Sequence, residues 1–373
     1  NCFSAYDLTI QWMPGAIVRF NFGGASEVLF KGTHATVPST RGGNLVFVDP
    51  WIEPHPSFSS ASIGPVLFEK RYASGLKFQG NNGWFSHYRN NTIVRASGMW
   101  NCHMDPAQLW GGGHMKPFAA TAGITFSITS GTTTLTSSAA FFTAAHAGTV
   151  MTLRGGGFFQ LFTISLIINS TTVTVSQTAS HTYTAAAGIS QGMRGSMTNG
   201  SPTLTMEAAC LVASDVGRSV IILNAVDLGG SIYKPLRTTI VSVDSNTVAT
   251  LASSASRTVS AEEIIFSPAV EFLHEGNAIT NDMSWGGLHV EQFAGCGLYF
   301  EGGVNVRLPE LKLHGYNATV DAFSSSFHAV FAYCNAEHIG AEFEGTVTNP
   351  KAGTHVSGNY IGMNFGYWSG TCQ

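Results

Sequence analysis

The sequence GTTTLT at 131–136 returns as GSPTLT at 200–205, and this repeat decides how the middle of the chain is organised. Three further pairs follow in the same order: AG at 147–148 and VG at 216–217, STTVT at 170–174 and SNTVA at 245–249, and ASHT at 179–182 and ASRT at 255–258. The spacing grows from 69 to 76 positions, and most of this growth falls across glycine-containing loops. The sequence therefore predicts two tandem modules of about 70 residues.

Each module shows short runs in which apolar and hydroxylated residues alternate, as expected for strands with one buried face. Four strands per module are predicted, at 132–136, 149–153, 161–168 and 171–176 in the first copy and at 203–206, 218–223, 238–243 and 247–251 in the second. This pattern favours a small antiparallel sandwich or barrel for each copy.

The segments on either side of the modules also have the sequence pattern of strands, and no stretch shows the pattern of an amphipathic helix of three turns. Predicted strands lie at 16–22, 27–31, 44–48, 75–79 and 92–95 before the modules, and at 287–293, 297–301, 304–306, 310–314 and 339–344 after them. Short strands separated by Gly or Asn turns at a regular spacing predict a right-handed parallel β-helix. An antiparallel β-sandwich throughout is the alternative.

These signals predict an all-β chain in which a right-handed parallel β-helix is interrupted by two tandem antiparallel β-modules. The expected boundaries are 1–120 for the first part of the helix, 121–190 and 191–262 for the two modules, and 263–373 for the second part.

Charged residues make up only 11% of the chain, against roughly 25% in an average soluble protein. The net charge is -4 and there is no run of Lys or Arg, which argues against binding to nucleic acid or to an anionic membrane. No apolar stretch is long enough for a membrane-spanning helix, so we expect no membrane insertion. The six cysteines show no CxxC spacing. Buried free thiols are favoured over disulfides, and no metal or cofactor is expected.

The segment GLHVEQFAGCGLYFEGGVNVRLPELKLHG at 287–315 resembles the turns of the pectate-lyase-like β-helices of tailspikes and tail fibres of tailed bacteriophages and related gene-transfer particles. The second module, with GSPTLT at 200–205, DVG at 215–217 and the pair TTI at 238–240 and SNTV at 245–248, is similar to modules found beside such helices. The resemblance covers about 230 residues, and its motifs record strands and turns rather than catalytic chemistry.

The resemblance implies a homotrimeric spike or fibre of a virion that binds a bacterial surface glycan and contacts other virion proteins. The chain departs from the family pattern in one respect, because about 145 residues interrupt the helix. The modules are therefore expected either to face the receptor or to form a collar that packs the trimer. Homotrimer formation is also expected on physical grounds, since an apolar, charge-poor flank of the β-helix is more stable when it is buried against other subunits.

Two groups of ionisable residues are candidates for catalysis. Glu342 and Glu344 stand two apart on a predicted strand, which places their Cα atoms about 6.5 to 7 Å apart. Inverting glycosidases hold two carboxyl groups about 6.5–9.5 Å apart. His289 and Glu291 form a second pair of this kind, and Glu301 is expected near them on the next turn. A solvated strand face or a polar ladder would produce the same patterns.

An aromatic and polar stretch before the modules is the candidate glycan-binding surface, because sugars stack on aromatic rings and hydrogen-bond to Asn and Arg. Its residues are Trp84, Tyr88, Arg89, Asn90, Trp100 and Trp110. Packing of these rings against the helix or a neighbouring subunit is the alternative. The leading hypothesis is attachment to bacterial polysaccharide, and the rivals are a polysaccharide depolymerase, acting as a hydrolase or lyase, and a purely structural fibre or collar.

Overall fold

The computed structural model describes residues 8–24, 26–33, 45–59, 62–71, 76–79, 88, 90–98, 100–104, 107–114, 117–118, 124–147, 150–155, 158–191, 194–207, 210–229, 233–273, 280–285, 288–293, 296–301, 303–304, 311–315, 327–332 and 363–365. Within these residues the chain is built from strands, and its only helical elements are two 3-10 turns, η1 (Ala144–His146) and η2 (Ala213–Asp215). The predicted all-β class is confirmed. No helix among the described residues is long and apolar enough to cross a membrane.

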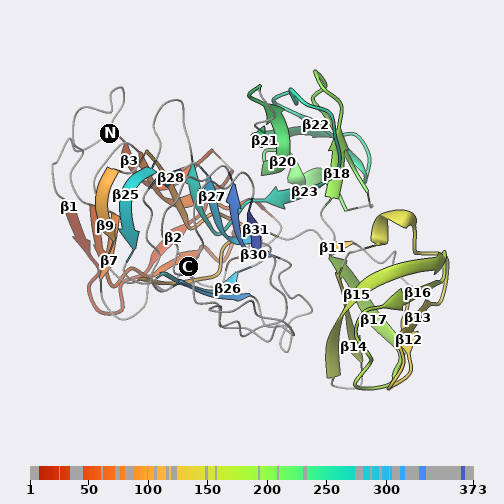
Figure 1. Cartoon of the computed structure of the whole chain (residues 1–373). Coiled ribbons are helices and arrows are strands. Elements are labelled where there is room, and N and C mark those ends of the chain that lie inside the picture. The colour runs from red at the N-terminus through yellow and green to blue at the C-terminus, as the bar shows by residue number, and fades with distance from the viewer. Residues whose placement is uncertain are drawn as a thin grey trace.

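Strands from both ends of the chain form parallel sheets (Figure 1). The largest sheet has the order β3-β6-β8-β24-β27-β30-β31, with the bounds β3 (Val28–Thr33), β6 (Val66–Arg71), β8 (Val94–Ser97), β24 (Val270–Leu273), β27 (Cys296–Glu301), β30 (Phe327–Ala332) and β31 (Met363–Phe365). Because all its neighbouring strands run in the same direction, each strand must be reached by a crossover through other parts of the molecule.

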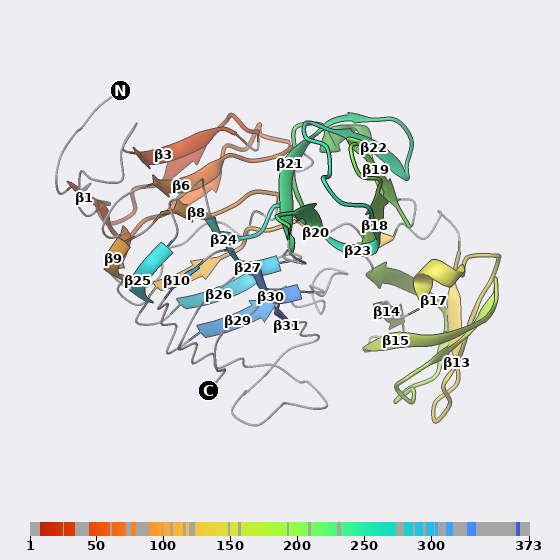
Figure 2. The same ribbon diagram turned by 45° about the horizontal axis from the view of Figure 1, so that its top comes forward.

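Four smaller parallel sheets accompany it. They are β1-β4-β7, β2-β5, β9-β25-β28 and β10-β26-β29, with the bounds β1 (Leu8–Gln11), β2 (Val18–Phe20), β4 (Leu45–Val48), β5 (Ile52–Pro54), β7 (Leu76–Gln79), β9 (Trp100–Met104), β10 (Ala107–Trp110), β25 (Thr280–Trp285), β26 (Leu288–Phe293), β28 (Gly303–Val304) and β29 (Leu311–Gly315). Along the chain, successive strands enter different sheets in a recurring order, so that β25, β26 and β27 extend three sheets in turn (Figure 2).

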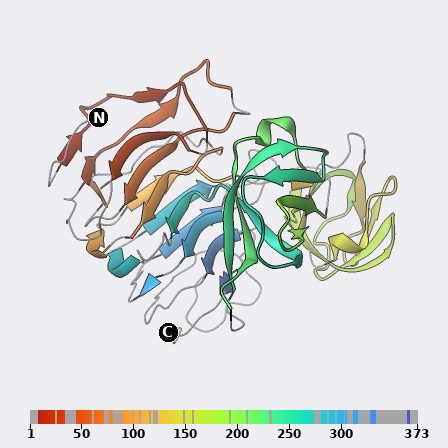
Figure 3. The ribbon, with the colours of Figure 1, turned by 90° about the horizontal axis from the view of Figure 1, so that it is seen from above.

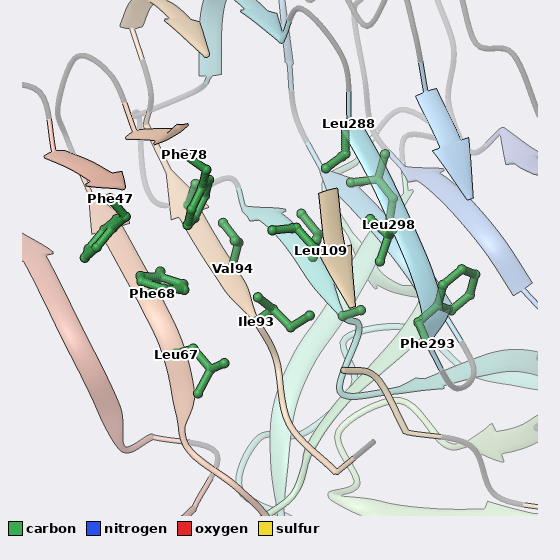
Figure 4. Packing of buried hydrophobic residues seen from close by; sticks show 14 of the residues in the cluster. Phe47, Leu67, Phe68, Phe78, Ile93, Val94, Leu109, Leu288, Phe293 and Leu298 are labelled. Carbon is green, nitrogen blue, oxygen red and sulfur yellow. The ribbon is translucent and has the colours of Figure 1, made fainter. Parts of the chain in front are cut away.

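One apolar core connects the parallel sheets (Figure 4). It contains Phe47, Phe68, Leu109, Val290 and Phe300, each 0% exposed, from strands of three different sheets. Aligned phenylalanines stack between neighbouring strands, with ring centroids 5.6 Å apart for Phe30 and Phe68 and 5.0 Å apart for Phe272 and Phe300. The register thus places like side chains above one another, and burial of these rings holds the sheets together.

The segment between β10 and β24 is an insertion into the parallel part of the molecule. Val94 of β8 is the direct neighbour of Val270 of β24, although the whole antiparallel region separates them in sequence. The sequence predicted such an interruption. The domain boundaries themselves stay a prediction.

The inserted segment contains two antiparallel rings of six strands, here called barrel one and barrel two (Figure 3). Barrel one has the order β12-β13-β16-β15-β14-β17, and β17 pairs with both β12 and β14; its strands are β12 (Phe126–Ile128), β13 (Thr134–Ser137), β14 (Val150–Gly155), β15 (Phe158–Asn169), β16 (Thr172–Val175) and β17 (Tyr183–Gln191), with β11 (Pro117–Phe118) attached to β17.

Barrel two is closed in the order β18-β19-β22-β21-β20-β23. Its strands are β18 (Arg194–Met197), β19 (Thr203–Met206), β20 (Ser219–Asp227), β21 (Tyr233–Val243), β22 (Val248–Leu251) and β23 (Val259–Phe266). Taken in chain order, its six strands pair as those of barrel one do. The structure therefore supports the duplication read from the sequence.

The sequence predicted four strands per module, and the structure corrects this to six. All eight predicted strands are present, and the missed ones are β12, β17, β18 and β23. In each barrel the two missed strands, which come first and last, pair with each other. These strands include the stretches RGSM and YTAAAGISQ, which lack the alternation of β-branched residues by which a strand is recognised.

The prediction of one right-handed parallel β-helix is not established by this arrangement, which consists of separate parallel sheets and antiparallel barrels. Predicted strands at the two ends agree with β2, β3, β4, β7, β8, β26, β27, β28 and β29. The predicted strand at 339–344 lies outside the described residues. Cys210 and Cys296 are buried free thiols, as favoured by the sequence.

Candidate functional site

The three-stranded sheet β10-β26-β29 brings together residues from two of the predicted sites. Its register aligns Trp110 with Glu291, and Glu291 with His314. Two positions earlier on each strand, Gln108 aligns with His289, and His289 with Lys312. Trp110 was predicted to bind glycan, whereas Glu291 and His289 were predicted to be catalytic. The structure places them on two neighbouring strands.

Between these two rows, Leu109 of β10 and Val290 of β26 face the core. Leu109 and Val290 are 0% exposed and belong to the core of the parallel sheets, whereas Trp110 and His289 are half-buried. Neighbouring strands lie about 4.8 Å apart, and positions two apart on one strand lie about 6.5–7 Å apart. The two rows therefore span a distance comparable to one sugar ring.

Sequence reasoning did not identify Gln108, Lys312 and His314 as site residues. Each occupies a position that alternates with an apolar residue, as in LKLHG of β29. That alternation was visible in the sequence, but the pairing partners were not.

Glu301 does not join this group. It lies on β27 of the seven-stranded sheet, not on the sheet of His289 and Glu291. Its side chain is 1% exposed. The Glu301 carboxylate is bound by Arg237 Nε at 2.8 Å and by the Tyr299 hydroxyl at 2.9 Å. Burial raises the pKa of Glu301, and the nearby Arg237 guanidinium opposes that rise.

Because Arg237 belongs to β21, the Glu301 carboxylate connects barrel two to the parallel sheet. Apolar side chains accompany this contact: Ile221, Leu223 and Ile265 of barrel two pack with Leu273, Cys296 and Tyr299 of the sheet. A polysaccharide does not reach a carboxylate that is this deeply covered. The structure thus gives Glu301 a docking role at an interface.

A row of alternating charges crosses the same face of the seven-stranded sheet. The register aligns Lys31, Glu69, Arg95, Glu271 and Tyr299 on five neighbouring strands. Arg95 pairs with both Glu69 and Glu271, and both carboxylates are 2% exposed. This row is a polar ladder, but it contains none of the residues for which a ladder was considered as the alternative to catalysis.

The predicted glycan-binding stretch is only partly described. Tyr88 packs edge-to-face against Phe20 and Phe58, and its hydroxyl donates to the carbonyl oxygens of Ser59 and Ser62. Burial raises the pKa of Tyr88 to about 12. The ring and hydroxyl of Tyr88 are thus engaged inside the molecule, which fits the packing alternative.

The remaining predicted residues are placed as follows. Asn90 is half-buried beside Asn91, and Trp100 lies on β9. Trp84, Arg89, Glu342 and Glu344 lie outside the described residues. Within the described part of the chain, no group of three or more His, Cys, Asp or Glu side chains is arranged to hold a metal ion.

No protein-family model matches the chain, and no curated protein matches it.

Proposed function

We propose that this chain is a spike or tail-fibre protein of a bacteriophage or related gene-transfer particle, and that it attaches the particle to bacterial surface polysaccharide. The observation that best supports this is the stack of aligned parallel strands around one apolar core, with two duplicated barrels inserted into it. Extended parallel stacks present long, regular surfaces, which suit repetitive polymers better than small molecules. The proposed location of the protein is the virion.

The finer arrangement belongs to the same proposal. The strands β25, β26 and β27 extend three parallel sheets in succession, and β28, β29 and β30 extend the same three sheets in the same order. We infer that these are turns of a right-handed parallel β-helix interrupted by the barrels. An experimental structure in which consecutive turns do not wind around one axis would contradict it.

A homotrimer is part of the proposal as well. Leu166 and Ile168 on β15 are 59% and 54% exposed, and Val241, on the corresponding strand of barrel two, is 54% exposed. Exposed apolar side chains on an otherwise charge-poor chain favour burial against sister chains or other virion proteins. Native mass spectrometry at micromolar protein concentration is expected to show a complex of three chains. A monomer would contradict the proposed homotrimer.

The attachment function is tested by incubating the full chain with an array of bacterial capsular polysaccharides and lipopolysaccharides. We expect retention of at least one glycan without any decrease in its length. Absence of retention on the whole array would contradict attachment and favour a structural fibre or collar.

A depolymerase is the second candidate, and the register of the sheet β10-β26-β29 favours it. A carboxylate position, Glu291, lies between an aromatic and a histidine position, and His289 lies next to Lys312. Acid-base chemistry on a sugar ring requires groups of these types. New reducing ends or unsaturated sugars in the same incubation, lost in Glu291→Gln, would establish it.

A further inference from the structure

A second aromatic and charged surface lies on the small sheet β2-β5, and none of the residues that form it was singled out from the sequence. Val18 pairs with Ile52, and Arg19 pairs with Glu53. Phe20 and Ile52 are 2% and 0% exposed and face the core. Trp51 stands two positions before Glu53, so strand alternation places both on the outer face with Arg19.

The Glu53 carboxylate organises this surface through both of its oxygen atoms. Trp51 Nε1 donates to Glu53 Oε1 at 2.9 Å, and Arg19 Nε contacts Glu53 Oε2 at 3.4 Å. Trp51 nevertheless remains 37% exposed, and the Arg19 side chain 45% exposed. An indole ring and a guanidinium group are therefore held in fixed positions at the surface.

Stability alone does not explain this arrangement. Exposed ion pairs contribute little to the stability of the folded protein, and a partly exposed tryptophan contributes less than a fully buried one. Among the described residues, Arg19 contacts the carboxylate through Nε only, which leaves its terminal amino groups available as donors.

More hydrogen-bonding groups follow directly after the two strands. His55 Nδ1 lies 2.7 Å from Ser57 Oγ, and Ser57 Oγ donates to Asn21 Oδ1 at 3.3 Å. All three side chains are exposed. The polar surface therefore continues beyond Arg19 and Glu53.

We propose that Trp51, Arg19 and Glu53 form a binding site for one neutral hexopyranose unit of a polysaccharide. The indole ring stacks on the C–H face of the sugar, the carboxylate accepts from one hydroxyl group, and the guanidinium donates to its neighbour. A neutral unit is favoured because Arg19 and Glu53 cancel in charge, so an anionic sugar gains no net attraction. The site rests on the proposed function only in taking a polysaccharide as its ligand.

A single open site of this kind is weak, and its dissociation constant for one oligosaccharide is expected to be about millimolar. Several copies of the site on one particle would bind a repetitive polymer together and raise the effective affinity. This suits an attachment protein that must contact a polymer at many points.

The test uses the full chain and a panel of neutral oligosaccharides of glucose, galactose and mannose, with polyuronate oligomers as the charged comparison. Saturation-transfer NMR measures binding. We expect the wild type to bind at least one neutral oligosaccharide, and Trp51→Ala to weaken that binding about tenfold because the stacking surface is lost. Arg19→Ala is expected to weaken it severalfold, whereas Trp51→Phe retains most of it.

Leu228→Ala is the control, since it removes an exposed apolar side chain of barrel two that belongs to no proposed binding surface, and it is expected to bind as the wild type does. Circular dichroism confirms that each variant is folded. If Trp51→Ala binds oligosaccharides as tightly as the wild type does, the proposed site is wrong, but the proposed attachment function is unaffected. If the wild type binds only the polyuronates, the proposal that the ligand is a neutral sugar is wrong. If the wild type binds neither panel nor any glycan on the array, the proposed function fails together with the site.

Discussion

Barrel one and barrel two share a backbone plan but differ in the chemistry that stabilises it. In barrel one, Ser127 Oγ accepts from the amide of Ala185 at 3.1 Å, and in barrel two Ser196 Oγ accepts from the amide of Ala261 at 3.1 Å. Both alanines have positive φ, at 47° and 55°. Gly131 and Gly200 likewise share φ values of 79° and 80°. The duplication therefore preserved the backbone geometry at these matching positions.

The two barrels diverge at the 3-10 turn. In barrel one, His146 Nδ1 accepts the amide of Thr143 at 3.0 Å; in barrel two, Asp215 Oδ2 accepts the amide of Val212 at 2.9 Å. Asp215 also pairs with Arg218 at 3.1 Å, and these side chains are 0% and 1% exposed. A neutral imidazole and a charged carboxylate thus perform the same capping role, but only the carboxylate is part of a buried ion pair.

The largest difference between the barrels is expected for Asp215→Ala, which leaves the Arg218 guanidinium buried without its partner. Such a loss costs about 3–5 kcal/mol. His146→Ala in barrel one removes a capping bond and the ring contacts with Phe141 and Phe142 but leaves no charge buried, so we expect a smaller cost of about 2 kcal/mol. Hydrogen exchange of amides in β20 and β14 reports each barrel separately. Equal losses in the two barrels would show that the ion pair is not what distinguishes them.

A second comparison concerns the docked face of barrel two. Ile265 is 0% exposed and packs with Leu273 and Tyr299, so Ile265→Ala is expected to cost about 2–4 kcal/mol. Because that contact crosses to the parallel sheet, amides of β24 and β27 should exchange faster as well. Ile164→Ala, a matched change inside barrel one, should affect barrel one alone. Unchanged exchange in β24 and β27 would rule out energetic coupling across the interface.

The pH dependence should also separate the barrels. Burial lowers the pKa of His146 below that of the unfolded chain, so the unfolded state binds the proton more readily. The stability that depends on neutral His146 is present above about pH 6.5 and is lost as the pH falls, by at most about 1.4 kcal/mol per unit. Hydrogen exchange of β14 between pH 7 and pH 5 measures this loss. His146→Gln should abolish it, and a loss that persists in this variant would assign it to another group.

The smallest effects are expected where the barrels agree. Ser127→Ala and Ser196→Ala each remove the acceptor of an alanine amide, and each should cost about 1 kcal/mol in its own barrel. The two values should match because the hydrogen bonds have the same length and place. Thermal unfolding of both variants provides the measurement. A cost confined to one barrel would mean that the shared geometry does not imply shared energetics.

The tandem repeat and the strand positions could be predicted from short stretches of sequence. The alternation of a strand and the glycine of a turn are each visible within a few residues. The runs around Leu135 and Leu204 show this, since both residues are 0% exposed at matching positions of β13 and β19. The candidate site was less predictable. Trp110 and Glu291 were assigned to separate sites, and only the pairing of β10 with β26 made them neighbours.

The amino-acid sequence by itself determined that this chain is all-β, charge-poor and internally duplicated, because those properties are encoded within each short segment. Tertiary structure decided that Glu301 is covered by barrel two, that Trp51 is held at the surface by Glu53, and that β8 neighbours β24. The physical reason is that strand pairing and side-chain burial depend on partners remote in sequence, and no local pattern specifies which partner is met.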